Sequence, residues 1–291
     1  MKAYTSPFQG WEQTAGVRWF SEQQMDIAGD GPWLPRTSFE HLRHPAVSHE
    51  ALCGRNGAAL LLVHLHMTRR LENELVGPVA RWVAAGGLGP GDDLIMDAFR
   101  LQCDESFHAL VCAGLTRRLA STYGIDATNF PEPLFLQHVR RLRAELADRV
   151  SPHHVDFAAV VVAETIVTKT LGEDWRDPEV RPCVRAFLKL HHEDEARHSA
   201  CMAQALSVAW EVWDAPTRRA ISEAWDDLCT SFIGPDVDAS TAALAAAGEP
   251  VESVGTFGEA LHASRATLIG GADLRMSRRA LSRAAEALMS A

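Results

Sequence analysis

A short acidic motif that ends in histidine occurs twice in this 291-residue chain, and an isolated glutamate precedes each copy at a similar distance. The first copy spans residues 104–108, with the sequence DESFH, and Glu72 lies 33 residues before its glutamate. The second copy spans residues 194–198, with the sequence DEARH, and Glu164 lies 31 residues before its glutamate. Four carboxylates and two imidazoles in a duplicated pattern are the ligand set of a two-metal site inside a four-helix bundle. The pattern therefore predicts a dinuclear metal centre.

The spacing of these residues requires long helices. Glu105 and His108 are three residues apart, as are Glu195 and His198, so each pair shares one face of a helix. About thirty residues correspond to one long helix, a turn and part of an antiparallel return helix. Each upstream glutamate can therefore face the motif of the neighbouring helix.

Helical periodicity distinguishes the two upstream glutamates from ordinary surface acids. Glu72 shares its stripe with Leu61, Leu65, Thr68, Leu75 and Val79. The nearby Glu74 instead falls on a polar stripe with Arg70 and Arg81. Glu164 lies among Phe157, Val160, Val161, Thr168 and Leu171. An unpaired buried carboxylate is costly unless it is protonated, and metal coordination removes that cost.

A third histidine extends the second motif. His191 lies four residues before Glu195 and shares its stripe, whereas His192 points about 100° away by helical geometry and is expected at the surface. By itself, His191 could be a ligand or a polar core residue. Beside the rest of the set, it is interpreted as a ligand.

The arrangement H-x-x-x-E-x-x-H over residues 191–198 resembles the para-aminobenzoate N-oxygenase family. Members of that family are ferritin-like non-haem diiron enzymes that oxidise arylamines to hydroxylamines and nitro compounds, and an extra histidine in the last metal-binding helix marks them. The resemblance covers about residues 55 to 210. It implies a homodimer and seven iron ligands, namely Glu72, Glu105, His108, Glu164, His191, Glu195 and His198.

Charge arithmetic supports iron in such a site. Four carboxylates balance two ferrous ions, which gives a neutral reduced centre that tolerates a dry interior. Oxidation to the diferric state adds two positive charges, which a bridging peroxide or oxide derived from O₂ would cancel. Mixed carboxylate and imidazole donors suit iron, and manganese also remains possible.

Further residues are expected around the ligands. Asp104 and Asp194 precede the motif glutamates and are predicted to accept hydrogen bonds from the outer N–H groups of the ligand histidines, with exposed helix positions as the alternative. Arg197 either joins this network or faces solvent. The residues one turn from a ligand on an inward stripe are candidates for lining a substrate pocket, with plain core packing as the alternative: Thr68, Leu101, Cys112, Val161, Thr168 and Met202.

The predicted fold is all-α, a ferritin-like four-helix bundle with additional helices and an irregular N-terminal arm. One domain is expected over 1–291, with the arm at 1–55, the metal-binding core at 56–210 and additional C-terminal helices at 211–291. Periodicity and punctuation predict helices at 57–86, 91–122, 132–147, 154–172, 179–210 and 214–232, and two more within 239–290. The stretch 234–257, rich in Ala, Gly, Pro and acids, is expected to be a mobile loop.

Composition excludes several classes of protein. No apolar run reaches 18 residues and no signal-like start is present, so a soluble cytoplasmic protein away from membranes is expected. The six cysteines form no C-x-x-C pair, which excludes an attached rubredoxin-type iron centre and fits reduced thiols. A net charge of -10 argues against nucleic acid. Since no flavin or NAD signature is found, electrons are expected from an external ferredoxin or reductase.

Other functions share this ligand pattern. A radical-generating ribonucleotide reductase subunit needs a tyrosine near the irons, and the two tyrosines, Tyr4 and Tyr123, make that unlikely in sequence terms, since Tyr123 lies about four turns from His108. A ferritin-type store, a manganese catalase and a bundle that has lost its metal remain alternatives. The nearest rival is a diiron oxygenase or desaturase that acts on carbon. His191 favours oxidation of an amine nitrogen.

Overall fold

The computed structural model describes the backbone of residues 4–39, 41–272 and 274–289. Within these ranges, the side chains of residues 22, 23, 36, 37, 168–170, 172, 173 and 287–289 are outside the description. All regular elements of the described chain are helical, and no strand occurs in it. The predicted all-α class is confirmed. Across the described residues, no helix combines the length and the apolar character needed to cross a membrane.

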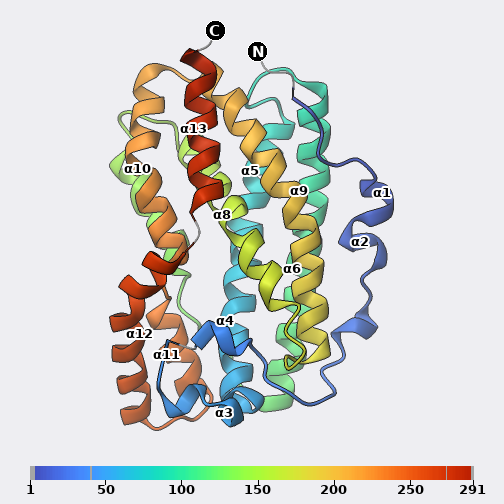
Figure 1. The fold of residues 1–291 in the computed structure, drawn as a ribbon, viewed down its shortest axis with the longest axis vertical. Helices are drawn as coiled ribbons and strands as arrows, with labels where there is room; N and C mark the ends of the chain where they lie inside the picture. Colours follow the sequence, from blue (N-terminus) through green and yellow to red (C-terminus); the bar gives the residue numbers. More distant parts are fainter. Residues whose placement is uncertain (1–3, 40, 273, 290–291) are drawn as a thin grey trace.

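Four long helical segments form the central bundle (Figure 1). The first is α4 (Arg55–Leu71) with its continuation α5 (Gly77–Ala84), and the second is α6 (Asp92–Tyr123). The third and fourth, α8 (Pro152–Asp174) and α9 (Pro182–Val212), pack extensively on each other, as α4 and α5 do on α6. The helix α7 (Leu134–Glu145) joins the two halves. The four bundle segments, and not α7, carry the duplicated motif and its upstream glutamates.

The first bundle segment is not one regular helix. A π-helical turn, η4 (Glu72–Val76), separates α4 from α5, and the Gly77 N–H donates to the carbonyl of Glu72, five residues back. Pro78 has no N–H to continue the α-helical pattern, and a Cβ on Gly77 would lie 2.9 Å from the Glu72 carbonyl oxygen. Glu72 is thus the first residue of this π-helical turn.

The C-terminal part differs from the prediction in two respects. The expected mobile loop at 234–257 is wrong, because α11 (Val237–Ala246) and the start of α12 (Val251–Gly271) occupy it. With α13 (Arg275–Met289), three helices follow α10 (Ala215–Ile233) where two were predicted. Alanine is the strongest helix former, and the Asp236 side chain caps α11 by accepting the Ala239 N–H at 3.0 Å. Composition suggested flexibility, whereas helix propensity and a cap decided the outcome.

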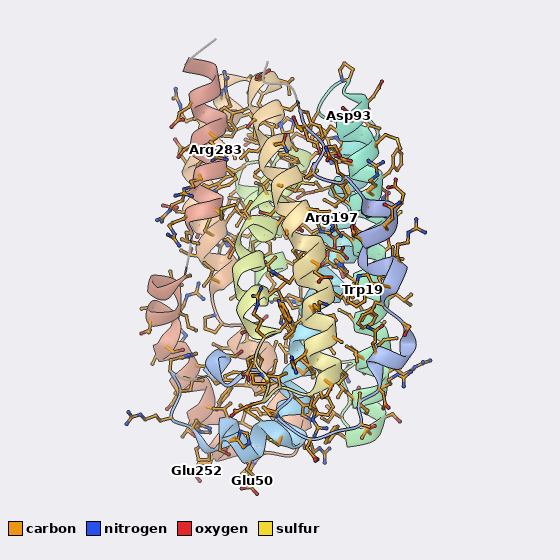
Figure 2. The ribbon with its side chains drawn as sticks, turned by 45° about the vertical axis from the view of Figure 1, so that its right-hand side comes forward. Trp19, Glu50, Asp93, Arg197, Glu252 and Arg283 are labelled. Atoms are coloured by element: carbon orange, nitrogen blue, oxygen red, sulfur yellow. The ribbon has the colours of Figure 1, made fainter. Side chains whose placement is uncertain are left out.

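The N-terminal arm is defined here as residues 4–53 and consists of short helical turns. Its first part runs outside α6 and α9, and its last part lies against α4 at the lower end of the bundle (Figures 1 and 2). These turns are α1 (Trp11–Thr14), α2 (Gly16–Trp19), η1 (Glu22–Met25), η2 (Arg36–Phe39), η3 (Pro45–Val47) and α3 (His49–Cys53). Figure 2 turns this side toward the viewer, where Trp19 of the arm and Arg197 of α9 are labelled. Although irregular, the arm contributes buried aromatic side chains to the core, among them Phe8, Trp11 and Trp33.

Candidate metal centre

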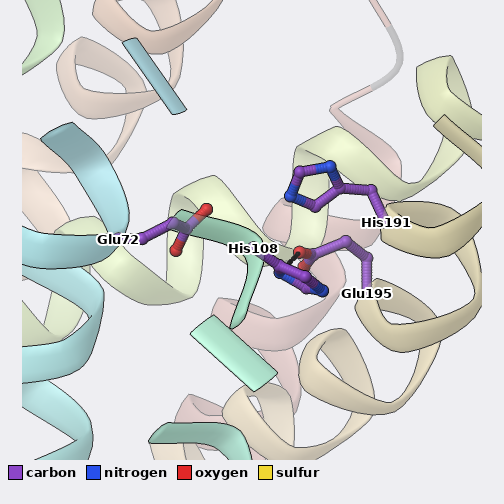
Figure 3. Close-up of side chains that lie close together, drawn as sticks. All are labelled: Glu72, His108, His191 and Glu195. Atoms are coloured by element: carbon purple, nitrogen blue, oxygen red, sulfur yellow. Dashed lines mark ion pairs between the residues drawn. The ribbon is translucent and has the colours of Figure 1, made fainter. Parts of the chain in front are cut away.

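Seven acidic and histidine side chains from the four bundle segments meet in the interior. One group contains Glu72, His108, His191 and Glu195 (Figure 3), and a second contains Glu105, Glu164, Glu195 and His198. In each group the potential ligand atoms lie within 4.8 Å of one another. Glu195 belongs to both groups, so it could help to hold both ions. All the residues predicted as ligands are therefore brought together.

The centre is dry and strongly acidic. Each of the seven side chains is at most 6% exposed. Four ionised carboxylates without counter-charge would be highly unfavourable here, whereas two divalent cations would neutralise them. Two buried donor atoms, Glu72 Oε2 and His191 Nε2, lack a hydrogen-bond partner among the described residues. Buried ligand atoms without a hydrogen-bond partner, close to other potential ligand atoms, are consistent with a pair of metal ions.

The two motif histidines present the same edge to the centre. Nδ1 of His108 lies 3.1 Å from Glu105 Oε2 and 3.8 Å from Glu195 Oε1. Nδ1 of His198 lies 2.8 Å from Glu105 Oε1 and 3.4 Å from Glu195 Oε2. In both rings Nδ1 therefore faces the carboxylates, and Nε2 points away from them.

The outer nitrogens are held by the two motif aspartates, each across the bundle from its own motif. Asp194 on α9 contacts Nε2 of His108 on α6 at 3.1 Å, and Asp104 on α6 contacts Nε2 of His198 on α9 at 3.2 Å. An Nε2–H that donates to a carboxylate leaves the Nδ1 lone pair for a metal ion. The fully buried aspartates thus select the same tautomer in both histidines.

The N-terminal arm in turn holds the aspartates. The indole N–H of Trp11 donates to both oxygens of Asp104 at 2.9 Å, and the Gly16 N–H donates to those of Asp194 at 3.2 Å. A Cβ on Gly16 would collide with Leu190 and lie 2.6 Å from Asp194 Oδ2, so only glycine allows this approach. Sequence reasoning predicted an irregular N-terminal arm but missed these contacts, because no periodicity links Trp11 or Gly16 to the motifs.

Two further contacts complete this side of the centre. Phe8 of the arm stacks on His198, with ring centroids 5.9 Å apart. Arg197 forms an ion pair with Asp194, so its side chain joins the network. Burial raises the pKa of Asp194, but the hydrogen bond and charge of His108, followed by the charges of His198 and Arg197, outweigh burial and lower it. We call the side of the centre formed by Asp104, Asp194, Arg197 and the arm residues that contact them the arm face.

The pKa values of the candidate ligands indicate how their charges are balanced in the absence of metal. Burial lowers the pKa of His108, but its contacts with Asp194 and Glu105 outweigh burial and raise the pKa to about 10. Burial and neighbouring carboxylates raise the pKa of Glu72 and Glu164 well above the usual range. Protons therefore supply the positive charge that metal ions would supply, and metal binding must displace them.

His191 differs from the two motif histidines. Its ring lies 4.2 Å from that of His108 between centroids. Burial and the proximity of His108 lower the pKa of His191 well below the usual range, so the ring is neutral at neutral pH. A neutral imidazole with an unpartnered nitrogen is competent to bind a metal ion.

A cavity of about 40 Å³ opens beside the centre on the side opposite the arm face. Four of the seven candidate ligands line it: Glu72, Glu164, His191 and Glu195. The remaining lining comes from His64, Met67, Thr68, Leu71, Ala163, Val167, Leu171 and Phe232. We call this side the cavity face and the space itself the inner chamber.

The residues proposed to line a substrate pocket lie in different parts of the structure. Thr68 lines the inner chamber. Leu101, Val161 and Met202 pack in the main hydrophobic core and Cys112 packs in a second core cluster, so these four are core residues outside the chamber lining. An inward stripe includes every residue that faces the bundle axis, and most of that axis is filled. Thr168 is among the side chains outside the description.

The comparisons with known proteins agree with this geometry. The sequence model of the family described as P-aminobenzoate N-oxygenase AurF matches residues 64–278, which include all seven candidate ligands. A search of curated proteins gave no match. Since the family match spans most of the chain, the protein belongs to the p-aminobenzoate N-oxygenase AurF family.

Proposed function

We propose that this protein is an O₂-dependent non-haem diiron oxygenase that transfers oxygen to the nitrogen of an amine. The observation that carries the proposal is His191, a seventh donor placed in one group with Glu72, His108 and Glu195. Membership of a family described by its N-oxygenase activity supports the same conclusion. Two iron ions at this centre would supply the chemistry by reducing and activating O₂.

The residues of the chain have distinct roles in this proposal. Glu72, Glu105, His108, Glu164, His191, Glu195 and His198 hold the ions, with manganese as the alternative metal. Asp104 and Asp194 fix the tautomer of the motif histidines, and Arg197 neutralises Asp194. The apolar walls of the inner chamber exclude water and admit the amine.

The overall reaction requires an electron donor. One N-hydroxylation combines the amine, O₂, two electrons and two protons to give a hydroxylamine and water. We infer an external ferredoxin or reductase as the source, because the sequence contains no flavin or NAD signature.

We further infer a homodimer. On α6, Met96, Phe99 and Leu110 are 52%, 51% and 64% exposed, so one helix presents three large apolar side chains to water. Burial against a second copy would remove them from water. Sedimentation of the wild-type protein and of Phe99→Asp tests this inference, with a monomeric variant as the expected result.

Product analysis with isotopically labelled oxygen tests the proposed function. The protein is loaded anaerobically with Fe(II), reduced, and mixed with ¹⁸O₂ and an arylamine such as aniline. We expect two irons per chain and a hydroxylamine that carries one labelled oxygen on nitrogen. Oxygen on a ring carbon would instead support the carbon-oxidising alternative, and iron uptake without any organic product would support storage. In the same assay, His191→Ala should keep the fold but alter reactivity with O₂, and unchanged turnover would contradict the role given to His191.

A further inference from the structure

A second cavity lies next to the inner chamber. It has a volume of about 210 Å³ and is walled by α4, α11 and the segment around Phe39. His64 and Met67 line both spaces, so they form the partition between them. We call the larger space the outer chamber.

The volumes of the two chambers suit different parts of an amine. A cavity of about 150 Å³ is known to hold benzene, so the inner chamber, at about 40 Å³, is too small for an aromatic ring. It can hold an amino group and small reactants beside Glu164, Glu195 and His191. The outer chamber, at about 210 Å³, is large enough for a ring or an equivalent alkyl body. Met67 is flexible, and its movement would join the two chambers.

The lining of the outer chamber is mainly apolar. Leu34, Phe39, Leu60, Val63, Met67, Pro133 and Ala239 form most of the wall. Two of the polar lining groups already have backbone partners: His66 contacts the Pro131 carbonyl at 3.1 Å, and Asp236 accepts the N–H groups of Leu134 and Ala239 at 2.9 and 3.0 Å. These groups stabilise the wall and offer a ligand little hydrogen bonding.

The charges around the chambers oppose an anionic ligand. Asp236 lines the outer chamber, whereas the carboxylates that line the inner one are balanced by metal ions or by protons and offer an acid no cationic partner. No lysine or arginine occurs among the described residues that line either space. His64 between the chambers adds no positive charge, since burial lowers its pKa. A carboxylate on the ligand would therefore lose its hydration without gaining a counter-ion from the described side chains of the lining.

We propose that the substrate is an amine with an elongated, uncharged and largely apolar body, which fills the outer chamber and directs its nitrogen past His64 and Met67 into the inner chamber. Acid-bearing amines such as 4-aminobenzoate are excluded from this binding mode. The assignment rests on the proposed function, because it takes the nitrogen as the reacting atom.

Equilibrium binding tests the assignment without relying on turnover. The protein is loaded with redox-inactive Zn(II), and calorimetry compares two ligands of similar length, 4-butylaniline and 4-(4-aminophenyl)butanoate. We expect the uncharged amine to bind at least about tenfold more tightly. Ser240→Trp, which fills the outer chamber from α11, should weaken 4-butylaniline at least about tenfold. Ala245→Trp on the exposed side of the same helix is the matched control and should change nothing.

Each other outcome overturns the assignment. These outcomes are equal binding of the acid, unchanged binding in Ser240→Trp, or no binding of either ligand. Ser240→Lys should reverse the discrimination against the acid, because a cation in the chamber wall should raise the affinity of the acid to that of the amine. If 4-butylaniline binds as expected but receives no oxygen from the iron-loaded protein, the proposed function fails and the binding site stands. If it is oxidised equally well by Ser240→Trp, the binding site fails and the proposed function stands.

Discussion

On the arm face of the candidate centre, the two aspartates that contact the motif histidines are each held by a residue of the arm, whereas on the cavity face the potential ligands border open space. Asp104 and Asp194 fix His198 and His108, and Trp11 and Gly16 of the arm fix the aspartates. Glu72 and His191 on the cavity face each keep a buried atom without a partner among the described residues. One face is thus built to prevent movement, and the other leaves room for exchangeable ligands.

The difference shows how one centre can be both rigid and reactive. Hydrogen-bonded residues outside the ligands set orientation and basicity, and they need no access to solvent or substrate. Reactants must approach from the side where the lining is apolar and incomplete. The comparison therefore separates residues that act through position from residues that contact reactants.

Substitution of the residue common to both metal groups should have the largest effect. Glu195→Ala removes the carboxylate that lies near both motif histidines, so binding of both ions should fall from two per chain to none. Metal content after anaerobic Fe(II) loading and desalting measures this. Glu193→Ala, a surface position paired with Lys189, is the control and should retain two ions. One retained ion in Glu195→Ala would mean that the two groups are independent.

Metal removal should make stability depend on pH through both faces. The folded pKa of His108 is raised from 6.5 to about 10, so its stabilising contribution is complete below pH 6.5 and is lost as the pH rises toward 10. The raised pKa values of Glu72 and Glu164 act in the same direction. The groups with lowered pKa values contribute fully above their unfolded values and do not oppose this trend at alkaline pH: Glu105, His191 and Asp194.

Urea unfolding near pH 7 and near pH 9.5 measures this dependence. The metal-free protein should lose on the order of a few kcal/mol of unfolding free energy, and the metal-loaded protein should lose much less. Equal stability of the metal-free protein at the two pH values would show that protons do not replace the metal ions.

Loss of an aspartate on the arm face should weaken metal binding without abolishing it. Asp104→Ala leaves the His198 Nε2–H without its acceptor, and changes of this kind cost about 10- to 100-fold in metal affinity. Competition with a chelator of known affinity gives the value. Asp93→Ala, at an exposed position in the first turn of α6, is the control. An unchanged affinity would contradict the positioning role of the arm face.

The smallest effect should come from the arm itself. Trp11→Phe removes one hydrogen bond to Asp104 while it keeps an aromatic ring, so about 1 kcal/mol and a several-fold loss of metal affinity are expected. Trp19→Phe makes the same change in the same arm at a position where the ring packs against Phe20 and Lys189. If both variants behave alike, the arm only covers the bundle and does not position the centre.

The helix classes and the seven candidate ligands could be predicted because each depends on local repetition. A spacing of three or four residues places side chains on one face of a helix. A carboxylate on an apolar stripe is buried at a high free-energy cost unless a metal ion or another partner binds it. Helix ends were less accurate: α9 begins at Pro182 rather than at 179, because proline without an N–H is favoured in the first turn. The π-turn at Glu72 was not predicted, because the intervals of three and four residues that join Glu72 to its stripe also fit a regular α-helix.

By itself, the sequence determined the all-α class, the four bundle segments and the identity of the potential ligands, because these follow from intervals along one or two helices. Only the tertiary structure decided which aspartate serves which histidine, since that pairing crosses from α6 to α9. It also decided the roles of Trp11 and Gly16, 93 and 178 residues from their partners, and the position of the two chambers. Contacts between distant segments depend on how the helices pack against one another, and no interval in the sequence encodes that directly.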